Sequence, residues 1–267
     1  MRDVIHLMGV YARTTAKAWF QYRFDTFMKS FTVFFREAAG IIVIWFTLLK
    51  FDKINGWDIY EMLFLFSLLF LTYGIMIIFF TGLRDFGNTV RSGNFDRFIL
   101  RPRGLLFQII FVNSDWFAAL GHGGLGITLF LLSARRAGIN WSLGTAVYCV
   151  FTVAGGVLIQ GAVFLFLASL NIFMLQTGSL KEVFYWNVRK FAGYPISIFN
   201  KVIQFFMVYV MPFAFVNYFP AAYLLGKGDV NYPDWYMFIT PAVGVAMYLL
   251  AYLFWRFSIR FYKSSGN

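Results

Sequence analysis

The chain is poor in the residues on which metal sites and disulfide frameworks depend. Its 267 residues include one cysteine, two histidines and 12 acidic side chains. The single Cys149 excludes an internal disulfide framework, and its apolar surroundings favour a small buried hydrophobic residue. His6 and His122 are too few and too isolated to indicate a metal site. We therefore expect no bound metal and no redox chemistry.

The motifs of ATP hydrolysis and nucleophilic catalysis are also absent. A phosphate-binding loop requires Gly-x-x-x-x-Gly-Lys-Ser/Thr, whereas Gly226-Lys227 has no glycine at the required upstream spacing and is followed by Gly228. No Gly-x-Ser-x-Gly elbow and no pair of carboxylates on one helix face is present. We predict that the chain is not an enzyme, has no catalytic residues and holds no cofactor of its own.

Charged residues are scarce, at 13% of the chain, while 60% is hydrophobic. A soluble domain of this size cannot bury that much apolar surface in one core. A membrane-crossing helix needs about 20 largely apolar residues, and six windows qualify, at 31–50, 59–81, 105–133, 143–175, 197–225 and 235–257. The sequence therefore predicts an all-α membrane protein, with a six-helix transmembrane domain over residues 31–263 and a short tail at 264–267.

The net charge of +11 lies mainly in the connectors between these windows. Membrane topology and anionic lipid headgroups explain it, so we expect no nucleic acid partner. One set of alternate connectors holds most of the basic residues: Arg2, Arg13, Lys17, Arg23, Lys29, Arg84, Arg91, Arg97, Arg101, Arg103, Lys181, Arg189, Lys190, Arg256, Arg260 and Lys263. Because cytoplasmic loops are enriched in Lys and Arg, we expect both termini and the loop at 82–104 in the cytoplasm.

Residues 1–30 carry basic side chains but no short apolar core followed by a cleavage site, so we expect no removable signal. Aromatic residues such as Trp19 and Tyr22 lie on one face of a helical pattern, and Arg13 and Lys17 lie on another. This pattern predicts an N-terminal helix in the plane of the inner leaflet. An ordinary cytoplasmic helix is the alternative.

Three ionisable residues fall inside apolar windows, namely Arg36, Glu37 and Asp115. Each costs about 2.5–3.5 kcal/mol at the bilayer centre if it is unpaired. Arg36 either extends to the interface or pairs with another helix, and Asp115 is either neutral or paired with Arg36. All three are candidates for an intramembrane pathway, whereas the glycines at 121–126 predict close helix packing.

Two segments interrupt the simple pattern of windows. Pro212, Asn217, Pro220 and Gly226 punctuate the fifth window, which predicts a broken, partly re-entrant element on the outer side before the last helix. A kinked span with an outer interfacial tail is the alternative. From near Asn171 to Pro195 the sequence is amphipathic, with Lys181, Glu182, Arg189 and Lys190, and is interpreted as a cytoplasmic segment with a second, weaker docking surface.

A short basic connector, Gly93-Asn94-Phe95-Asp96-Arg97-Phe98-Ile99-Leu100-Arg101-Pro102-Arg103, lies between the second and third windows. Its spacing predicts a short amphipathic helix that ends before Pro102. The connector resembles the "small-x-hydrophobic-Asp-Arg-hydrophobic-x-Leu-Arg-Pro" segment of type-two permeases of ATP-binding cassette (ABC) exporters. Residues 212–221 with Leu224-Leu225-Gly226 resemble the outer signature of that family. With the span pattern, the resemblance covers essentially the whole chain.

The resemblance implies a permease in a bacterial plasma membrane that pairs with a second permease, identical or related. It also implies two separate ABC ATPase subunits that bind ATP and Mg. Loop 82–104 is then the coupling helix seated in a groove of the ATPase. Six residues are assigned to this contact: Phe95, Asp96, Arg97, Phe98, Arg101 and Arg103. We expect the aromatic members and Ile99 to fill the groove and the charged ones to form ion pairs at its rim.

Several interpretations remain open at this point. The basic loop fits a pure topology determinant without a partner. Arg36, Glu37 and Asp115 fit an ion-coupled carrier or channel, although no inverted repeat is visible between the two halves. A membrane scaffold explains the loop but not the polar residues in several windows. The 36 Phe, 15 Tyr and 8 Trp suit a hydrophobic or amphipathic cargo, but such residues also face lipid and pack cores.

Overall fold

A computed structural model describes residues 23–51, 53–112, 116–174, 177–228 and 231–264. These residues form helices and loops, and their only β-type pairing is an isolated bridge between Ile54 and Trp57. The α-helices are α2 (Arg23–Phe51), α3 (Ile59–Arg84), α4 (Phe86–Arg91), α5 (Asn94–Ile99), α6 (Leu105–Val112), α7 (Trp116–Arg136), α8 (Leu143–Leu170), α9 (Gly178–Lys181), α10 (Val188–Ala192), α11 (Lys201–Phe205), α12 (Tyr218–Leu224) and α13 (Thr240–Ser258). π-Helical stretches cover Glu182–Asn187 and Phe206–Val210. The N-terminal interfacial helix expected at 1–30 lies mostly outside the described residues.

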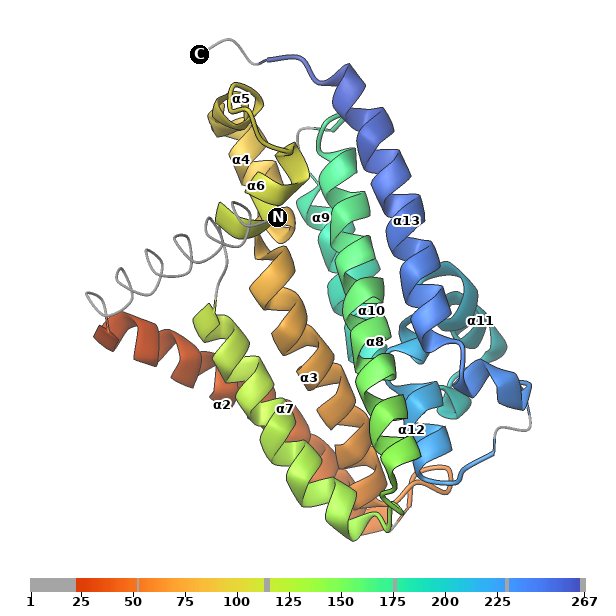
Figure 1. The fold of residues 1–267 in the computed structure, drawn as a ribbon. Helices are drawn as coiled ribbons and strands as arrows, with labels where there is room; N and C mark the ends of the chain where they lie inside the picture. Colours follow the sequence, from red (N-terminus) through yellow and green to blue (C-terminus); the bar gives the residue numbers. More distant parts are fainter. Residues whose placement is uncertain (1–22, 52, 113–115, 175–176, 229–230, 265–267) are drawn as a thin grey trace.

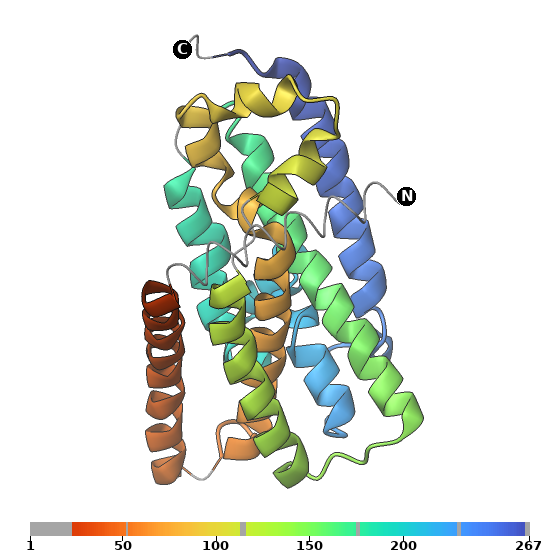
Figure 2. The same cartoon turned by 60° about the vertical axis from the view of Figure 1, so that its left-hand side comes forward.

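Helix α3 forms the centre of the bundle (Figure 1). It packs against α7 on one side and α8 on the other, while α13 covers the far side of α8 and α2 lies at the edge against α7 (Figure 2). Because α3 is surrounded, it is apolar on all faces rather than amphipathic. It begins at a capping box, in which Asp58 accepts from the backbone of Glu61 and the Glu61 side chain accepts from the backbone of Asp58.

Glycines set the closest approaches between these helices. A Cβ atom on Gly126 of α7 would lie 2.7 Å from the backbone nitrogen of Leu71 on α3. A Cβ atom on Gly244 of α13 would lie 2.5 Å from the carbonyl oxygen of Gly155 on α8. The expected packing role of the glycines at 121–126 is therefore confirmed at Gly126, where no side chain fits between the two backbones.

Three described helical segments are long and apolar enough to cross a bilayer, namely Ile59–Arg91, Leu143–Leu170 and Thr240–Phe261. The bent pair Lys201–Val210 and Phe213–Leu224 adds a fourth if it is counted as one span. The all-helical architecture is therefore confirmed for the described residues, whereas the count of six spans stays a prediction. Helices α2 and α7 occupy predicted windows but are interrupted by polar residues or glycines.

The segment from residue 178 to residue 198 runs along the bundle instead of lying in a cytoplasmic connector. At one end, Lys181 Nζ donates to the carbonyl of Arg84 at 3.0 Å. At the other end, Ser197 Oγ accepts from Asn55 Nδ2 at 2.9 Å. Arg84 ends α3 and Asn55 precedes its start, so this segment spans the length of α3. The interpretation as a cytoplasmic docking segment is wrong, because the segment lies along the bundle and its Tyr185 and Arg189 find partners on α8 and α2.

The broken element at residues 201–224 enters and leaves at the same end of the molecule. Its two helical parts meet at an angle of 76° around Met211 and Pro212. The preceding Ser197 contacts Asn55, and Lys227, just beyond its end, donates to the carbonyl of Gly56 at 2.9 Å. The break is therefore confirmed, and these contacts favour the re-entrant path over a kinked span.

Buried polar groups hold this re-entrant element in place. Asn217 is fully buried, and its Nδ2 donates to the carbonyl of Ala192 at 2.6 Å and to that of Leu65 at 3.3 Å. Pro220 is buried within α12, and Gly226 ends that helix with a φ of +65°, which favours glycine. Within the element, the carbonyl of Phe215 accepts from Thr240 Oγ1 at 3.1 Å, a protein partner of the kind that irregular backbone at membrane depth requires.

Candidate functional site

Helices α4 and α5 form a cap at one end of the bundle, beside the C-terminal end of α13 (Figure 1). Gly93 starts α5 with a φ of +68°, which explains a small residue at the first position of the motif. Phe95 is fully buried, and its ring lies edge-on to Phe86 at 5.0 Å and to Tyr262 at 4.7 Å between centroids. The inner face of α5 is therefore part of the chain's own core.

Two hydrogen-bond clusters fix this cap to the membrane helices. Asp96 accepts hydrogen bonds from the Tyr262 hydroxyl at 2.8 Å and from Ser264 Oγ at 2.7 Å. Gln108 Nε2 on α6 donates to the carbonyls of Phe98 at 3.1 Å and Arg103 at 3.0 Å. Burial and the Asp96 carboxylate raise the pKa of Tyr262 to about 12, so its hydroxyl stays protonated as a donor at neutral pH.

The predicted groove-filling role of Phe95 and Phe98 is wrong for the structure described, because both side chains are buried against their own chain. Asp96 likewise bonds to the C-terminal segment rather than standing free as a rim charge. Seven other residues of the motif are exposed, and we call the five that are basic or aliphatic the coupling surface: Arg97, Ile99, Leu100, Arg101 and Arg103. Leu100 is its most exposed apolar side chain, at 84%.

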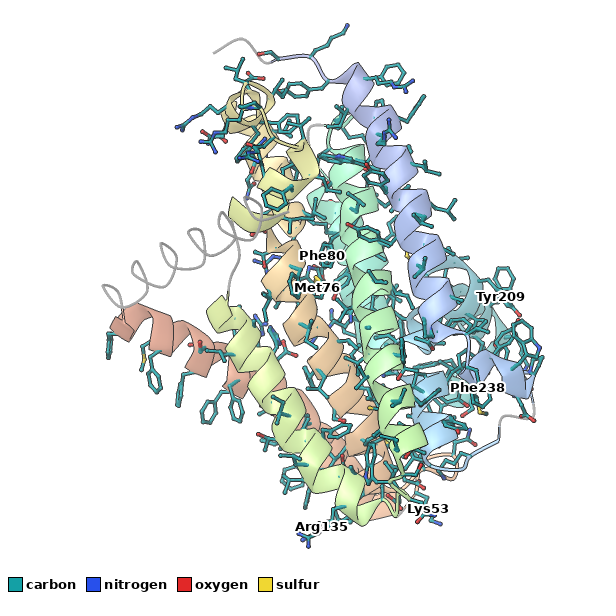
Figure 3. The ribbon with its side chains drawn as sticks, in the orientation of Figure 1. Lys53, Met76, Phe80, Arg135, Tyr209 and Phe238 are labelled. Atoms are coloured by element: carbon teal, nitrogen blue, oxygen red, sulfur yellow. The ribbon has the colours of Figure 1, made fainter. Side chains whose placement is uncertain are left out.

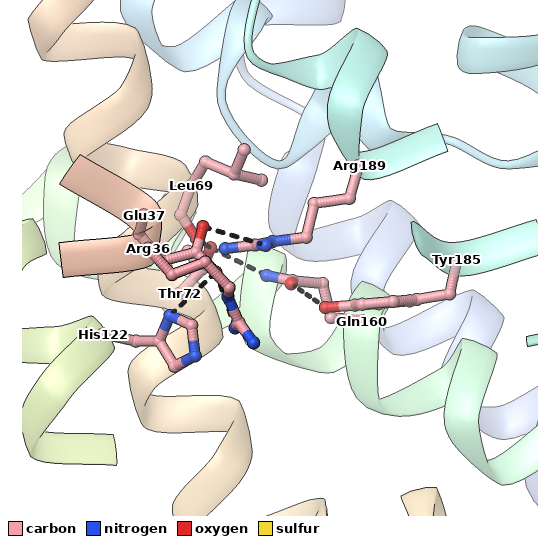
Figure 4. Close-up of polar contacts among 8 residues, drawn as sticks. All are labelled: Arg36, Glu37, Leu69, Thr72, His122, Gln160, Tyr185 and Arg189. Atoms are coloured by element: carbon pink, nitrogen blue, oxygen red, sulfur yellow. Dashed lines mark hydrogen bonds and ion pairs between the residues drawn. The ribbon is translucent and has the colours of Figure 1, made fainter. Parts of the chain in front are cut away.

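A second polar site lies inside the bundle, around Glu37 of α2 (Figure 4). Its Oε1 lies 2.9 Å from Arg36 Nη2 and 3.9 Å from His122 Nδ1, and its Oε2 lies 3.5 Å from Arg189 Nη1. We call these four residues the ion cluster. The structure thus brings Arg36 and Glu37 together, whereas Asp115 lies outside the described residues.

Arg189 and His122 are the members of the ion cluster that the sequence did not reveal. Arg189 is the more telling of the two. Its side chain is only 10% exposed, and its guanidinium lies 4.4 Å from the ring centroid of Tyr73 and 5.3 Å from that of Phe70. Its Nε and Nη2 atoms are buried and have no hydrogen-bond partner among the described residues. The one available signal was the helical spacing of residues 181–190, which fits a bundle helix as well as a surface helix.

A chain of hydrogen bonds lies beside the ion cluster and joins three elements. Tyr185 donates to Gln160 Oε1 at 2.7 Å, and Gln160 Nε2 donates to Thr72 Oγ1 at 2.8 Å. All three side chains are buried. Since each polar atom in this chain has a partner, the network fixes the segment 178–198 against α3 and α8.

The side chains of the two polar sites bear on metal binding as well. The described part of the chain contains no group of three or more His, Cys, Asp or Glu side chains placed to hold a metal ion. The buried Cys149 lies beside an apolar groove. What the arrangement offers is an exposed basic surface at one end and charged groups within the membrane-spanning bundle.

Comparison with known proteins gives one finding. The family model described as "ABC-2 family transporter protein" matches residues 34–266. No curated protein and no solved structure matches the chain.

Proposed function

We propose, from the premise that this chain belongs to the ABC-2 family of transporter proteins, that it exports a hydrophobic or amphipathic substrate through the membrane. Its membership makes it an integral membrane permease of an ABC transporter, the component distinct from the ATPase, with ATPase subunits as partners. We propose further that a second permease, identical or related, completes the pathway, and that ATP and Mg bind in the partner ATPases.

One observation carries the proposed mechanism, namely the coupling surface on a braced cap. Arg97, Leu100 and Arg101 are exposed, while the Phe98 carbonyl anchors α5 to α6 and Asp96 anchors it to the segment after α13. An apolar side chain flanked by arginines can occupy a partner's groove and form ion pairs around it. ATP-driven movement of that partner would then push on α5, and the bracing would pass the movement to the membrane helices.

Co-purification with the ATPase subunit of the same transporter tests the coupling role. We expect Leu100→Asp and Arg101→Glu to lose the complex and the stimulation of ATP hydrolysis, with membrane insertion unchanged. Arg135→Glu is the matched control, because Arg135 lies at the opposite end of the bundle (Figure 3). Full complex recovery with both coupling-surface variants would remove the basis of the assignment.

The orientation of the cap is tested separately. In a Cys149→Ser background, Leu100→Cys and Lys53→Cys place single thiols at opposite ends of the bundle (Figure 3). In intact cells, a membrane-impermeant maleimide is expected to label the Lys53→Cys variant and to spare the Leu100→Cys variant. The reverse pattern places the coupling surface outside the cell, where no ATPase can reach it.

The ion cluster supports a second candidate function, an ion-coupled carrier. Arg36, Glu37, His122 and Arg189 include the charged groups that such a relay needs. Transport by reconstituted vesicles separates the two functions. Transport that needs ATP and the ATPase subunit supports the permease, whereas transport driven by an ion gradient without that subunit supports the carrier.

A further inference from the structure

A small cavity lies where α2, α3 and α10 meet, next to the ion cluster. Its volume is about 230 Å³, and its lining includes Arg36, Glu37, Arg189 and Lys190 together with Phe66 and Phe70. Drug-sized ligands occupy pockets of roughly 300–1,000 Å³. The cavity is therefore too small for a whole substrate of that size and suits a single polar headgroup.

The charge of the lining is unbalanced among the described residues. Arg36, Arg189 and Lys190 are cationic, and Glu37 is the single carboxylate on the wall. Glu182 lies 3.8 Å from Lys190, but both side chains are largely exposed, so this pair neutralises little. Excess positive charge at membrane depth is costly, so an anion in the cavity would stabilise this arrangement.

The hydrogen bonding of Arg189 indicates the same ligand chemistry. Only its Nη1 approaches Glu37, at 3.5 Å, while Nε and Nη2 have no acceptor among the residues that the structure describes. The Nε and Nη2 edge of a guanidinium is a fork that matches two oxygens of a phosphate or carboxylate group. An oxyanion would supply the acceptors that the described part of the chain does not.

The surface beside Arg36 is apolar. Phe31 and Phe35, on the same helix, are 47% and 55% exposed. A molecule with its headgroup in the cavity can therefore lay an acyl chain along α2. This combination fits an amphiphile better than a free ion.

We propose that this cavity binds the phosphate group of an anionic amphiphile, held by Arg36, Arg189 and Lys190. A phosphate monoester carries about −1.5 to −2 charges at pH 7, which matches the surplus of three cations over one carboxylate. The inference concerns binding alone and does not depend on the ATPase partner. Its failure would leave the proposed transport function untouched, and the reverse also holds.

Titration of the purified chain in phosphatidylcholine nanodiscs tests this site. The probe is dioctanoyl phosphatidic acid, with dioctanoyl phosphatidylcholine as the comparison without net charge, and binding is measured by calorimetry. We expect Arg36→Gln and Lys190→Gln each to weaken binding of the phosphatidic acid roughly tenfold. Both side chains are mostly exposed, so neither change should unfold the protein.

Arg135→Gln is the matched control, since it removes one arginine at the end of α7 away from the cavity. If Arg135→Gln weakens phosphatidic acid binding as much as the test variants do, general surface charge explains the effect and the proposal is overturned. Unchanged binding in both Arg36→Gln and Lys190→Gln also overturns it. Inorganic phosphate serves as the competitor. Displacement of the lipid by inorganic phosphate identifies free phosphate as a ligand, and lack of displacement identifies the lipid headgroup. If phosphatidic acid does not bind at all, the proposed phosphate site is overturned.

Discussion

Replacement of Arg189 by glutamine is expected to destabilise the protein far more than the same change at Arg36. Distance alone suggests the opposite, because Arg36 lies 2.9 Å from the Glu37 carboxylate and Arg189 lies 3.5 Å from it. Exposure decides between them, since the Arg36 side chain is 63% exposed and that of Arg189 is 10%. Exposed ion pairs contribute about 0–1 kcal/mol, whereas removal of one partner from a buried pair costs about 3–5 kcal/mol.

The aromatic surroundings of Arg189 add to this difference. Its guanidinium lies 4.4 Å from the centroid of the Tyr73 ring and 5.3 Å from that of Phe70. A desolvated cation–π contact contributes about 2 kcal/mol, although the terms overlap and do not simply add. We therefore expect Arg189→Gln to lower the free energy of unfolding by roughly 4 kcal/mol and Arg36→Gln by less than about 1 kcal/mol.

Equilibrium unfolding in mixed micelles of dodecyl sulfate, followed by circular dichroism, measures both losses. Lys190→Gln is the neighbouring control, because its side chain is 71% exposed and its effect should match that of Arg36→Gln. In the double variant Glu37→Gln/Arg189→Gln the loss should be smaller than the sum of the single losses, since no lone buried charge remains. Equal losses for Arg36→Gln and Arg189→Gln, or strict additivity in the double variant, would refute the reasoning from burial.

Three further changes probe the packing and the cap. Gly82→Ala should yield no folded, monodisperse protein in size-exclusion chromatography, because a Cβ atom there overlaps a backbone carbonyl of α6. Gly104→Ala is the control, since a Cβ atom there meets open space, and this variant should elute normally. Tyr185→Phe should cost about 1–3 kcal/mol of unfolding free energy by leaving Gln160 unsatisfied, and adding Gln160→Leu should cost less than the two single losses together. Tyr262→Phe should halve or further reduce ATPase stimulation without loss of the complex. The stability that the Tyr262 hydrogen bond contributes should be complete below about pH 10, the unfolded pKa. It should be lost as the pH rises through about 12, the raised pKa of the folded state. Unfolding measured over a pH series, with the Tyr262→Phe variant as the baseline, checks this.

The long apolar helices and the break before the last of them could be predicted from sequence because their causes are local. Helices α3 and α8 come from uninterrupted apolar runs. The break at Met211 and Pro212 occurs because proline has no backbone N–H to donate and disfavours the helical conformation of the residue before it. These properties act within a few residues, so no knowledge of distant contacts is needed.

The path of residues 178–198 could not be predicted, because its polar residues are satisfied by distant partners. Arg189 meets Glu37, which lies on α2, and Tyr185 meets Gln160 on α8. A hydropathy window counts each such residue as a cost, whereas the structure offsets that cost through tertiary contacts. Hydropathy therefore places Lys181, Arg189 and Lys190 in a cytoplasmic connector, because it does not register the distant partners of such residues.

The cap shows a different limit of sequence reasoning. The spacing of Phe95 and Phe98 places both on one face of a short helix, but it does not say whether that face meets the same chain or a partner. In the structure this face meets the same chain, because Phe86 and Tyr262 form an aromatic cluster around Phe95.

The internal use of Asp96 changes what the partner must offer. With this carboxylate bound to Tyr262 and Ser264, the charged members of the coupling surface are the three arginines at 97, 101 and 103. A complementary groove therefore has to combine acidic side chains at its rim with an apolar floor for Leu100. Charges at the rim are screened within about 8 Å at physiological ionic strength. We accordingly expect salt to slow association with the ATPase, while the apolar contact of Leu100 governs how long the complex lasts.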